Sequence, residues 1–344
     1  MKLGATAVVA GVIAVAASAT PAPAQTITWN FNMFGPPRAV TAGIEAMAEF
    51  YKKESNGQFQ IKIAYGAALG PERQSPEAIK SGGYEAAQLC AGYYPNKFPL
   101  ATVMELPFLP PRKITDNAKV YTAVMSHPAI VKEMAERWNM RYLAPSVLPA
   151  FEFMGNKRIA SVADMKGVKM RIAGLNAKAL QAFGAVPTMV TAPESYQALE
   201  RGTIDSFGFP YSYTFGAYKL YEVAKYVTEG MAMSGFLCWQ AVSITAWNKL
   251  PDNLKAKLPQ AQALAMDALL KAYQKEDDKW IPIFRQKLEL TEFPEAERDK
   301  LVDASTPIWQ AWAKDQDAAG RPGTEMLNFV KGEVAKTKAA VGKK

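Results

Sequence analysis

One arginine in the sequence has the surroundings of an anion-binding residue. Arg171 lies near the end of the stretch 164–174, where apolar and basic residues alternate after a turn marked by Asp164 and Gly167. This period of two predicts a short strand, and Gly174 opens the next helix. Open α/β sheets bind ligands at the carboxyl edge of their strands, and there a guanidinium can hold a carboxylate through two parallel hydrogen bonds. The alternative is a surface arginine on an edge strand.

Aromatic residues gather near the ends of several predicted strands. Ligand pockets are mostly apolar with a few placed polar groups, so these rings are candidates to enclose the body of a ligand. Any one of them could instead belong to the core. The candidates are Tyr93, Phe151, Phe209, Tyr211 and Trp239.

The sequence offers little for catalysis. His127 is the only histidine, which leaves no triad or HExxH zinc site, and no phosphate-binding or dinucleotide-binding glycine motif occurs. The net charge of +8 is concentrated partly in the last fourteen residues, and no basic stripe with interleaved aromatics suggests nucleic acid. We therefore expect a binding protein without metal or cofactor rather than an enzyme, although a carboxylate or lysine enzyme leaves no such motif.

Residues 1–24 have the composition of a secretory signal peptide. Lys2 is their only charge, an apolar run covers 7–17, and an Ala-x-Ala site precedes Gln25. No later stretch approaches the length of a membrane span. The mature protein is thus expected in the periplasm. Such a compartment permits a disulfide between Cys90 and Cys238, but their apolar surroundings suit buried thiols equally well.

The order of the predicted elements indicates an α/β protein of two lobes. Strands alternate with helices over 26–91 and again over 170–209, and the segment 76–85 matches 193–205 in its helix, glycine and acidic residue. A strand over 237–245 and a long helix over 260–288, with Leu264 on its apolar face, follow. We assign 25–148 plus about 237–276 to lobe I and 149–236 plus about 277–344 to lobe II. The absence of a linker predicts that the chain crosses between the lobes more than once, within secondary structure.

The chain resembles the periplasmic solute-binding subunits of TRAP transporters, the DctP family. The motifs that carry the resemblance occur in order over nearly all of the mature chain: Ser55–Gly57, Leu69–Arg73, Glu105–Phe108, Asp164–Arg171, Phe183–Pro187, Tyr196–Leu199, Gly202–Asp205 and Trp247–Pro251. The resemblance implies two lobes joined by crossing strands and a long helix. It also implies a carboxylate-binding role for Arg171 and delivery of the ligand to membrane subunits driven by an ion gradient.

Three departures from sialic-acid-binding relatives bear on the ligand. Phe151, Phe209 and Cys90 stand where those relatives have an arginine, an asparagine and a glutamate. Apolar residues there leave the groups of a hydroxyl-rich ligand unpaired, so an aromatic or otherwise apolar monocarboxylate is expected. The protein is expected to be a monomer. The alternatives to a transport role are a component that presents its ligand to a sensor, and a small-acid lyase or isomerase.

Overall fold

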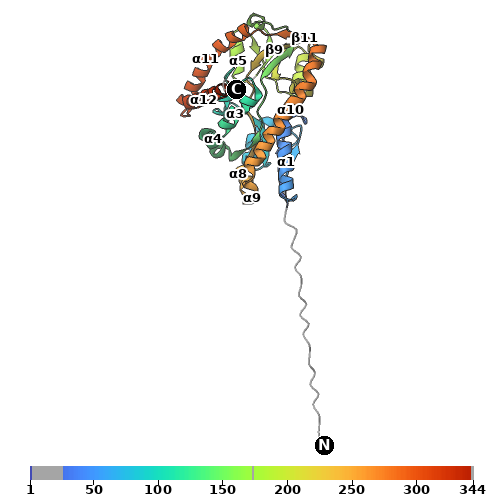
Figure 1. Cartoon of the computed structure of the whole chain (residues 1–344), viewed down its shortest axis with the longest axis vertical. Coiled ribbons are helices and arrows are strands. Elements are labelled where there is room, and N and C mark those ends of the chain that lie inside the picture. Colours follow the sequence, from blue (N-terminus) through green and yellow to red (C-terminus); the bar gives the residue numbers. More distant parts are fainter. Residues whose placement is uncertain (2–25, 173, 342–344) are drawn as a thin grey trace.

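The computed structural model describes residue 1, residues 26–172 and residues 174–341. The predicted signal peptide lies outside these residues, apart from Met1. Two mixed sheets form two lobes, and helices surround both (Figure 1). The predicted two-lobed α/β architecture is therefore confirmed. Among the helices of the described residues, none has both the length and the apolar character needed to cross a membrane.

The first sheet has the strand order β2-β1-β3-β10-β4. Its strands are β1 (Ile27–Asn32), β2 (Phe59–Ala64), β3 (Ala86–Cys90), β4 (Met140–Pro145) and β10 (Cys238–Ser243). β1 runs parallel to β2 and β3, whereas β10 runs antiparallel to β3 and β4. The strand predicted over 237–245 thus ends early, because helix α8 begins at Ile244.

The second sheet has the order β11-β9-β5-β8-β6-β7. Its strands are β5 (Phe151–Gly155), β6 (Lys169–Arg171), β7 (Val186–Pro187), β8 (Ser206–Pro210), β9 (Tyr226–Met233) and β11 (Glu289–Glu292). β6 runs parallel to β7 and β8, and β5 runs antiparallel to β8 and β9. Apart from the added edge strand β11, this is the topology of the first sheet with β6 in the place of β1.

The predicted internal repeat has a physical basis in these two sheets. Glu85 Oε2 accepts a hydrogen bond from the backbone N–H of Asn30 in β1 at 2.8 Å. Asp205 Oδ2 accepts one from the backbone N–H of Lys169 in β6 at 2.9 Å. The two matched carboxylates therefore secure the equivalent strand in each lobe.

Each sheet contains one antiparallel strand that the chain reaches by crossing from the other lobe. Residues 146–150 lead from β4 in the first sheet to β5 in the second, and residues 234–237 lead from β9 back to β10. The expected multiple crossing is confirmed, but the expectation that it runs within secondary structure is wrong for these two crossings, because both segments lie between strands. The cavity described below lies beside both crossings.

Helices cover the sheets and connect the lobes. They are α1 (Ala42–Glu54), α2 (Ser75–Ser81), α3 (Ile114–Met125), α4 (Pro128–Trp138), α5 (Asn176–Gln181), α6 (Ser195–Glu200), α7 (Tyr213–Ala217), α8 (Ile244–Asn248), α9 (Asp252–Lys255), α10 (Leu258–Lys287), α11 (Glu295–Ala318) and α12 (Gly323–Val341). The long helix α10 packs on α1 and β4 at one end and reaches α7 and β11 at the other (Figure 1). Its buried face contains Ala261, Ala265, Leu269 and Tyr273, whereas Leu264 is exposed.

The C-terminal segment forms two long helices. α11 packs on α5 of the second lobe, and α12 packs on α11 and on α3. Helix α3 belongs with the first sheet, because the hydroxyl of its Tyr121 donates a hydrogen bond to the Cys238 carbonyl in β10. The last helix, α12, therefore packs against the first lobe, whereas α11 before it packs against the second. The exact division of the chain between the lobes stays a prediction.

Candidate ligand-binding site

A narrow cavity lies between the two lobes. It encloses about 400 Å³ of empty space, its open mouth included. Its lining comes from both sheets and both crossings: Phe34, Arg38, Gln88, Cys90, Tyr93, Leu148, Phe151, Arg171, Ala192, Phe209, Pro210, Tyr213, Thr214, Tyr218, Phe236 and Cys238. The lining is therefore mostly apolar, with a few polar side chains from both sheets.

Arg171 is the charged centre of this cavity. It ends strand β6, and its side chain is only 1% exposed. Nε donates to the Val190 carbonyl at 2.9 Å, and Nη1 donates to the Gly208 carbonyl at 3.1 Å. Nη2 is buried and has no hydrogen-bond partner among the described residues. The two backbone bonds thus fix the guanidinium and leave one end available.

The surroundings of Arg171 are mostly aromatic and contain no counter-ion among the residues that the structure describes. Its guanidinium carbon lies 3.8 Å from the ring centre of Phe209 and 5.9 Å from that of Phe236. Burial lowers the pKa of Arg171, and the nearby phenols of Tyr93 and Tyr218 act in the opposite direction. Within the described chain, no carboxylate forms an ion pair with it. A buried cation without a partner is costly, so an anionic ligand at Nη2 would be strongly favoured.

Aromatic rings form the walls beside the guanidinium. Tyr93 packs edge-on against Phe34 at 5.8 Å and against Phe236 at 5.5 Å between ring centres. Phe151 contacts Phe236 at 5.8 Å. The structure therefore brings four of the predicted residues, Arg171, Tyr93, Phe151 and Phe209, to one cavity.

Two of the predicted aromatic residues lie elsewhere. The Tyr211 hydroxyl donates to Glu229, and its ring packs 6.1 Å from Phe284 on α10. Trp239 is fully buried and packs 5.0 Å from Phe98 in the first lobe. Successive strand residues point to opposite faces, so Trp239 points away from the cavity that its neighbour Cys238 lines.

The two cysteines, whose pairing the sequence left open, form a disulfide. Cys90 and Cys238 face each other in the antiparallel register of β3 and β10, and both line the cavity. The disulfide joins two strands of the same sheet. It therefore supplies part of the cavity floor without tying one lobe to the other.

Several lining residues were not predicted. Gln88 precedes Cys90 by two residues on β3, so the strand alternation already placed it on the same face. Phe236 comes from the second crossing, for which the sequence has no periodic signal. The three lining residues Gln88, Thr214 and Tyr218 each carry a buried oxygen that has no hydrogen-bond partner among the described residues.

A buried carboxyl group lies behind the cavity at Glu105. This residue is 1% exposed, and its Oε1 accepts a hydrogen bond from the Leu237 N–H in the second crossing at 3.3 Å. Its Oε2 lies close to Gly174, just after β6: a Cβ atom added at Gly174 would be 2.6 Å from this oxygen. Burial raises the pKa of Glu105 to about 8. A largely protonated carboxyl group therefore packs between residues of the two lobes at neutral pH.

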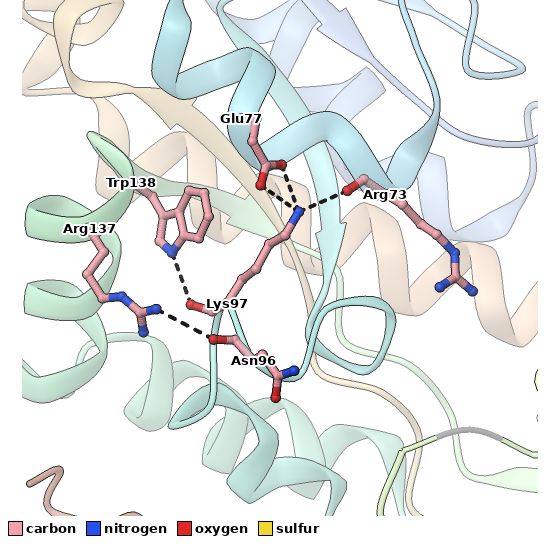
Figure 2. Close-up of polar contacts among 6 residues, drawn as sticks. All are labelled: Arg73, Glu77, Asn96, Lys97, Arg137 and Trp138. Atoms are coloured by element: carbon pink, nitrogen blue, oxygen red, sulfur yellow. Dashed lines mark hydrogen bonds and ion pairs between the residues drawn. The ribbon is translucent and has the colours of Figure 1, made fainter. Parts of the chain in front are cut away.

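A polar network holds the loop that follows Tyr93. Figure 2 shows Lys97 between Glu77 and the carbonyl of Arg73, at 2.7 Å and 3.1 Å from Nζ. Trp138 Nε1 donates to the Lys97 carbonyl at 3.0 Å. The guanidinium of Arg73 lies 5.9 Å from the Tyr93 ring centre. These contacts fasten the loop to α2 and α4 and so help to position Tyr93.

A cavity between two lobes that are joined by crossing segments defines the chain as a two-lobed ligand-binding protein. A family model described as bacterial extracellular solute-binding protein, family 7 (DctP), matches residues 33–315. The chain belongs to this family.

Individual relatives agree with this assignment. A solute-binding protein of Verminephrobacter eiseniae is 30% identical over 191 residues, which are 54% of this chain and 55% of that protein. The C4-dicarboxylate-binding periplasmic protein DctP of Rhodobacter capsulatus is 26% identical, covering 93% of this chain and 94% of that protein. The chain thus spans about half the length of the first relative and nearly all of the second.

Solved structures show the same fold. A TRAP periplasmic solute-binding protein from Desulfovibrio salexigens with bound orotic acid has a TM-score of 0.80 and 22% identity, covering 90% of this chain and 99% of that one. Together, the family model, the relatives and this likeness in fold confirm the predicted membership of the TRAP solute-binding family.

Proposed function

We propose that this protein captures an organic-acid anion in the periplasm, through its carboxylate, and delivers it to the membrane subunits of a TRAP transporter. One observation carries the proposal: the guanidinium of Arg171 is buried at an inter-lobe cavity, with Nη2 unpaired in the described structure and no carboxylate against it. Relatives described as binding C4-dicarboxylates and orotic acid support the organic-acid class.

The ligand is an aromatic or otherwise apolar monocarboxylate in this proposal. Phe151 and Phe209 line the cavity where sialic-acid-binding relatives carry polar residues, and Cys90 is engaged in the disulfide. Arg171 is the one cationic side chain in the lining that is fully buried; Arg38, the other lining arginine, is half-buried and donates to the Phe34 and Pro36 carbonyls. The second carboxylate of a dicarboxylate ligand would therefore find no cationic side chain in the lining as buried as Arg171.

Closure of the lobes gives the interaction its strength. Water leaves the cavity as the lobes meet, and an ion pair is stronger in the drier surroundings. Tyr93 and Phe209 enclose the ligand while the two backbone bonds of Arg171 hold its guanidinium in place. The exported form begins after the predicted signal peptide, and an ion gradient drives the membrane step.

A thermal-shift screen of the ligand-free protein tests the proposal. The panel contains aromatic monocarboxylates, aliphatic keto acids, C4-dicarboxylates and sugar acids. A ligand at a hundred times its dissociation constant stabilises the folded state by about 2.7 kcal/mol, which shifts the melting temperature by several degrees. We expect aromatic or apolar monocarboxylates to give the shift; a response to sugar acids alone contradicts the proposed ligand class.

Substitution of Arg171 tests its role directly. Removing one partner of a buried charge pair costs about 2–5 kcal/mol, so Arg171→Ala should weaken binding roughly thirty-fold to several thousand-fold. Arg141 provides the control, because its guanidinium carbon also stacks on a ring, 3.9 Å from the centre of Trp247, but away from the cavity. Arg141→Ala should leave affinity unchanged, and full affinity in Arg171→Ala would refute the assignment.

A further inference from the structure

The cavity has a second polar end, in the other lobe from Arg171. Gln88 and Cys90 lie on the same face of β3, because strand residues two apart point the same way. Both line the cavity from the first sheet, whereas Arg171 lines it from the second. Gln88 precedes the disulfide-bonded Cys90 by two residues on β3, so their Cα atoms are about 7 Å apart along the strand. The cavity is therefore lined by a polar side chain from each sheet.

The amide of Gln88 is only half satisfied. The side chain is 2% exposed, and Nε2 donates to Ser146 Oγ at 3.2 Å. Oε1 is buried and accepts no hydrogen bond from any described residue. A buried carbonyl oxygen without a partner costs free energy, and such groups in native proteins usually have a ligand, water or protein donor.

We propose that the ligand carries a hydrogen-bond donor, a hydroxyl or amino group, at the end remote from its carboxylate, and that Gln88 is the residue that selects for it. This inference rests on the proposed function, since it takes Arg171 as the carboxylate partner. A purely apolar acid would bury the Gln88 carbonyl against carbon. A hydroxylated acid gives that oxygen a donor while its ring or chain remains between Phe151 and Phe209.

Matched pairs of acids test the inference on the wild-type protein. The pairs are para-hydroxyphenylacetate with phenylacetate, and gamma-hydroxybutyrate with butyrate, measured by calorimetric titration. The hydroxylated member of the pair that fits should bind about ten- to a hundred-fold more tightly, because the site rejects a molecule that leaves its polar group unpaired. Equal affinity within every pair that binds overturns the inference.

Two variants identify the residue responsible. Gln88→Met keeps the length of the side chain and removes the carbonyl, so the preference for the hydroxylated acid should disappear. Gln60 on β2 is the control, because its Nε2 donates to the Gly57 carbonyl at 3.3 Å and it does not line the cavity. Gln60→Met should keep the full preference. A preference that persists in Gln88→Met overturns the assignment.

The outcomes separate this inference from the proposed function. Binding that depends on Arg171 but shows no preference for the hydroxylated acid would refute the role of Gln88 and leave the proposed carboxylate site intact. Binding that survives Arg171→Ala removes the proposed carboxylate site, and failure of every acid to bind removes both.

Discussion

Replacing Glu105 by glutamine should make the protein more stable, and by an amount that depends on pH. Glu105 is buried between residues of both lobes, and its Oε2 has no partner among the described residues. Burial raises its pKa from 4.5 to about 8. The folded state therefore contains the neutral acid at neutral pH, and glutamine is a neutral side chain of nearly the same shape that can still accept the Leu237 N–H.

The size of the effect follows from the difference between the two pKa values. An acid with a raised pKa in the folded state contributes its full stability below the unfolded value of 4.5. Between pH 4.5 and about 8 the unfolded chain ionises while the folded protein stays protonated, and stability falls by about 1.4 kcal/mol per pH unit. The wild-type protein loses about 5 kcal/mol of unfolding free energy at most across this range. Glu105→Gln should not lose it, because glutamine does not ionise.

Urea unfolding of both proteins across this range measures the difference. The free energies of unfolding should nearly coincide at pH 4, and Glu105→Gln should become progressively more stable toward pH 8. Glu49→Gln, on the exposed side of α1, is the control for the loss of one carboxylate. A constant difference between Glu105→Gln and wild type would show that the carboxyl group is not protonated in the folded state.

Two further predictions concern the disulfide and the turn after β6. Replacing both Cys90 and Cys238 by alanine should lower stability by about 2–5 kcal/mol, because the bond closes a loop with a sequence separation of 148 residues; a reducing agent should lower the urea midpoint of wild type but not of this variant. Gly174→Ala should lower the melting temperature more than Gly167→Ala, because both residues have positive φ angles but only at Gly174 would the new Cβ approach Glu105 Oε2, within 2.6 Å. Equal effects of the two glycine variants would exclude this contact.

Local sequence patterns predicted the elements that carry Arg171. The turn at Asp164 forms as expected: its Oδ2 accepts the N–H groups of Ala160 and Ser161 at 2.8 and 2.9 Å. β6 follows and ends at Arg171. Period-two alternation and turn residues are properties of a few neighbouring positions, so a single sequence reveals them.

The strands that the sequence did not reveal depend on non-local pairing. β9 has positive φ angles at Gly230 and Ala232, and its pairing with β5 shifts register between Phe151 and Phe153. This irregularity destroys the alternation that would mark β9 as a strand. The side-chain direction of Tyr211 was missed for a related reason: β8 ends at Pro210, and beyond it the strand period no longer determines which way a residue points.

The crossing topology places the proposed ligand site where closure of the lobes would act on it. Each crossing inserts a strand into the opposite sheet, so the crossing residues Leu148 and Phe236 necessarily lie beside the inter-lobe cavity. The disulfide lies within the first sheet and leaves the position of one lobe relative to the other to the crossings and α10. A ligand that bonds Arg171 in the second lobe and Gln88 in the first interacts fully only when the lobes are closed, and this difference in affinity shifts the population toward the closed state.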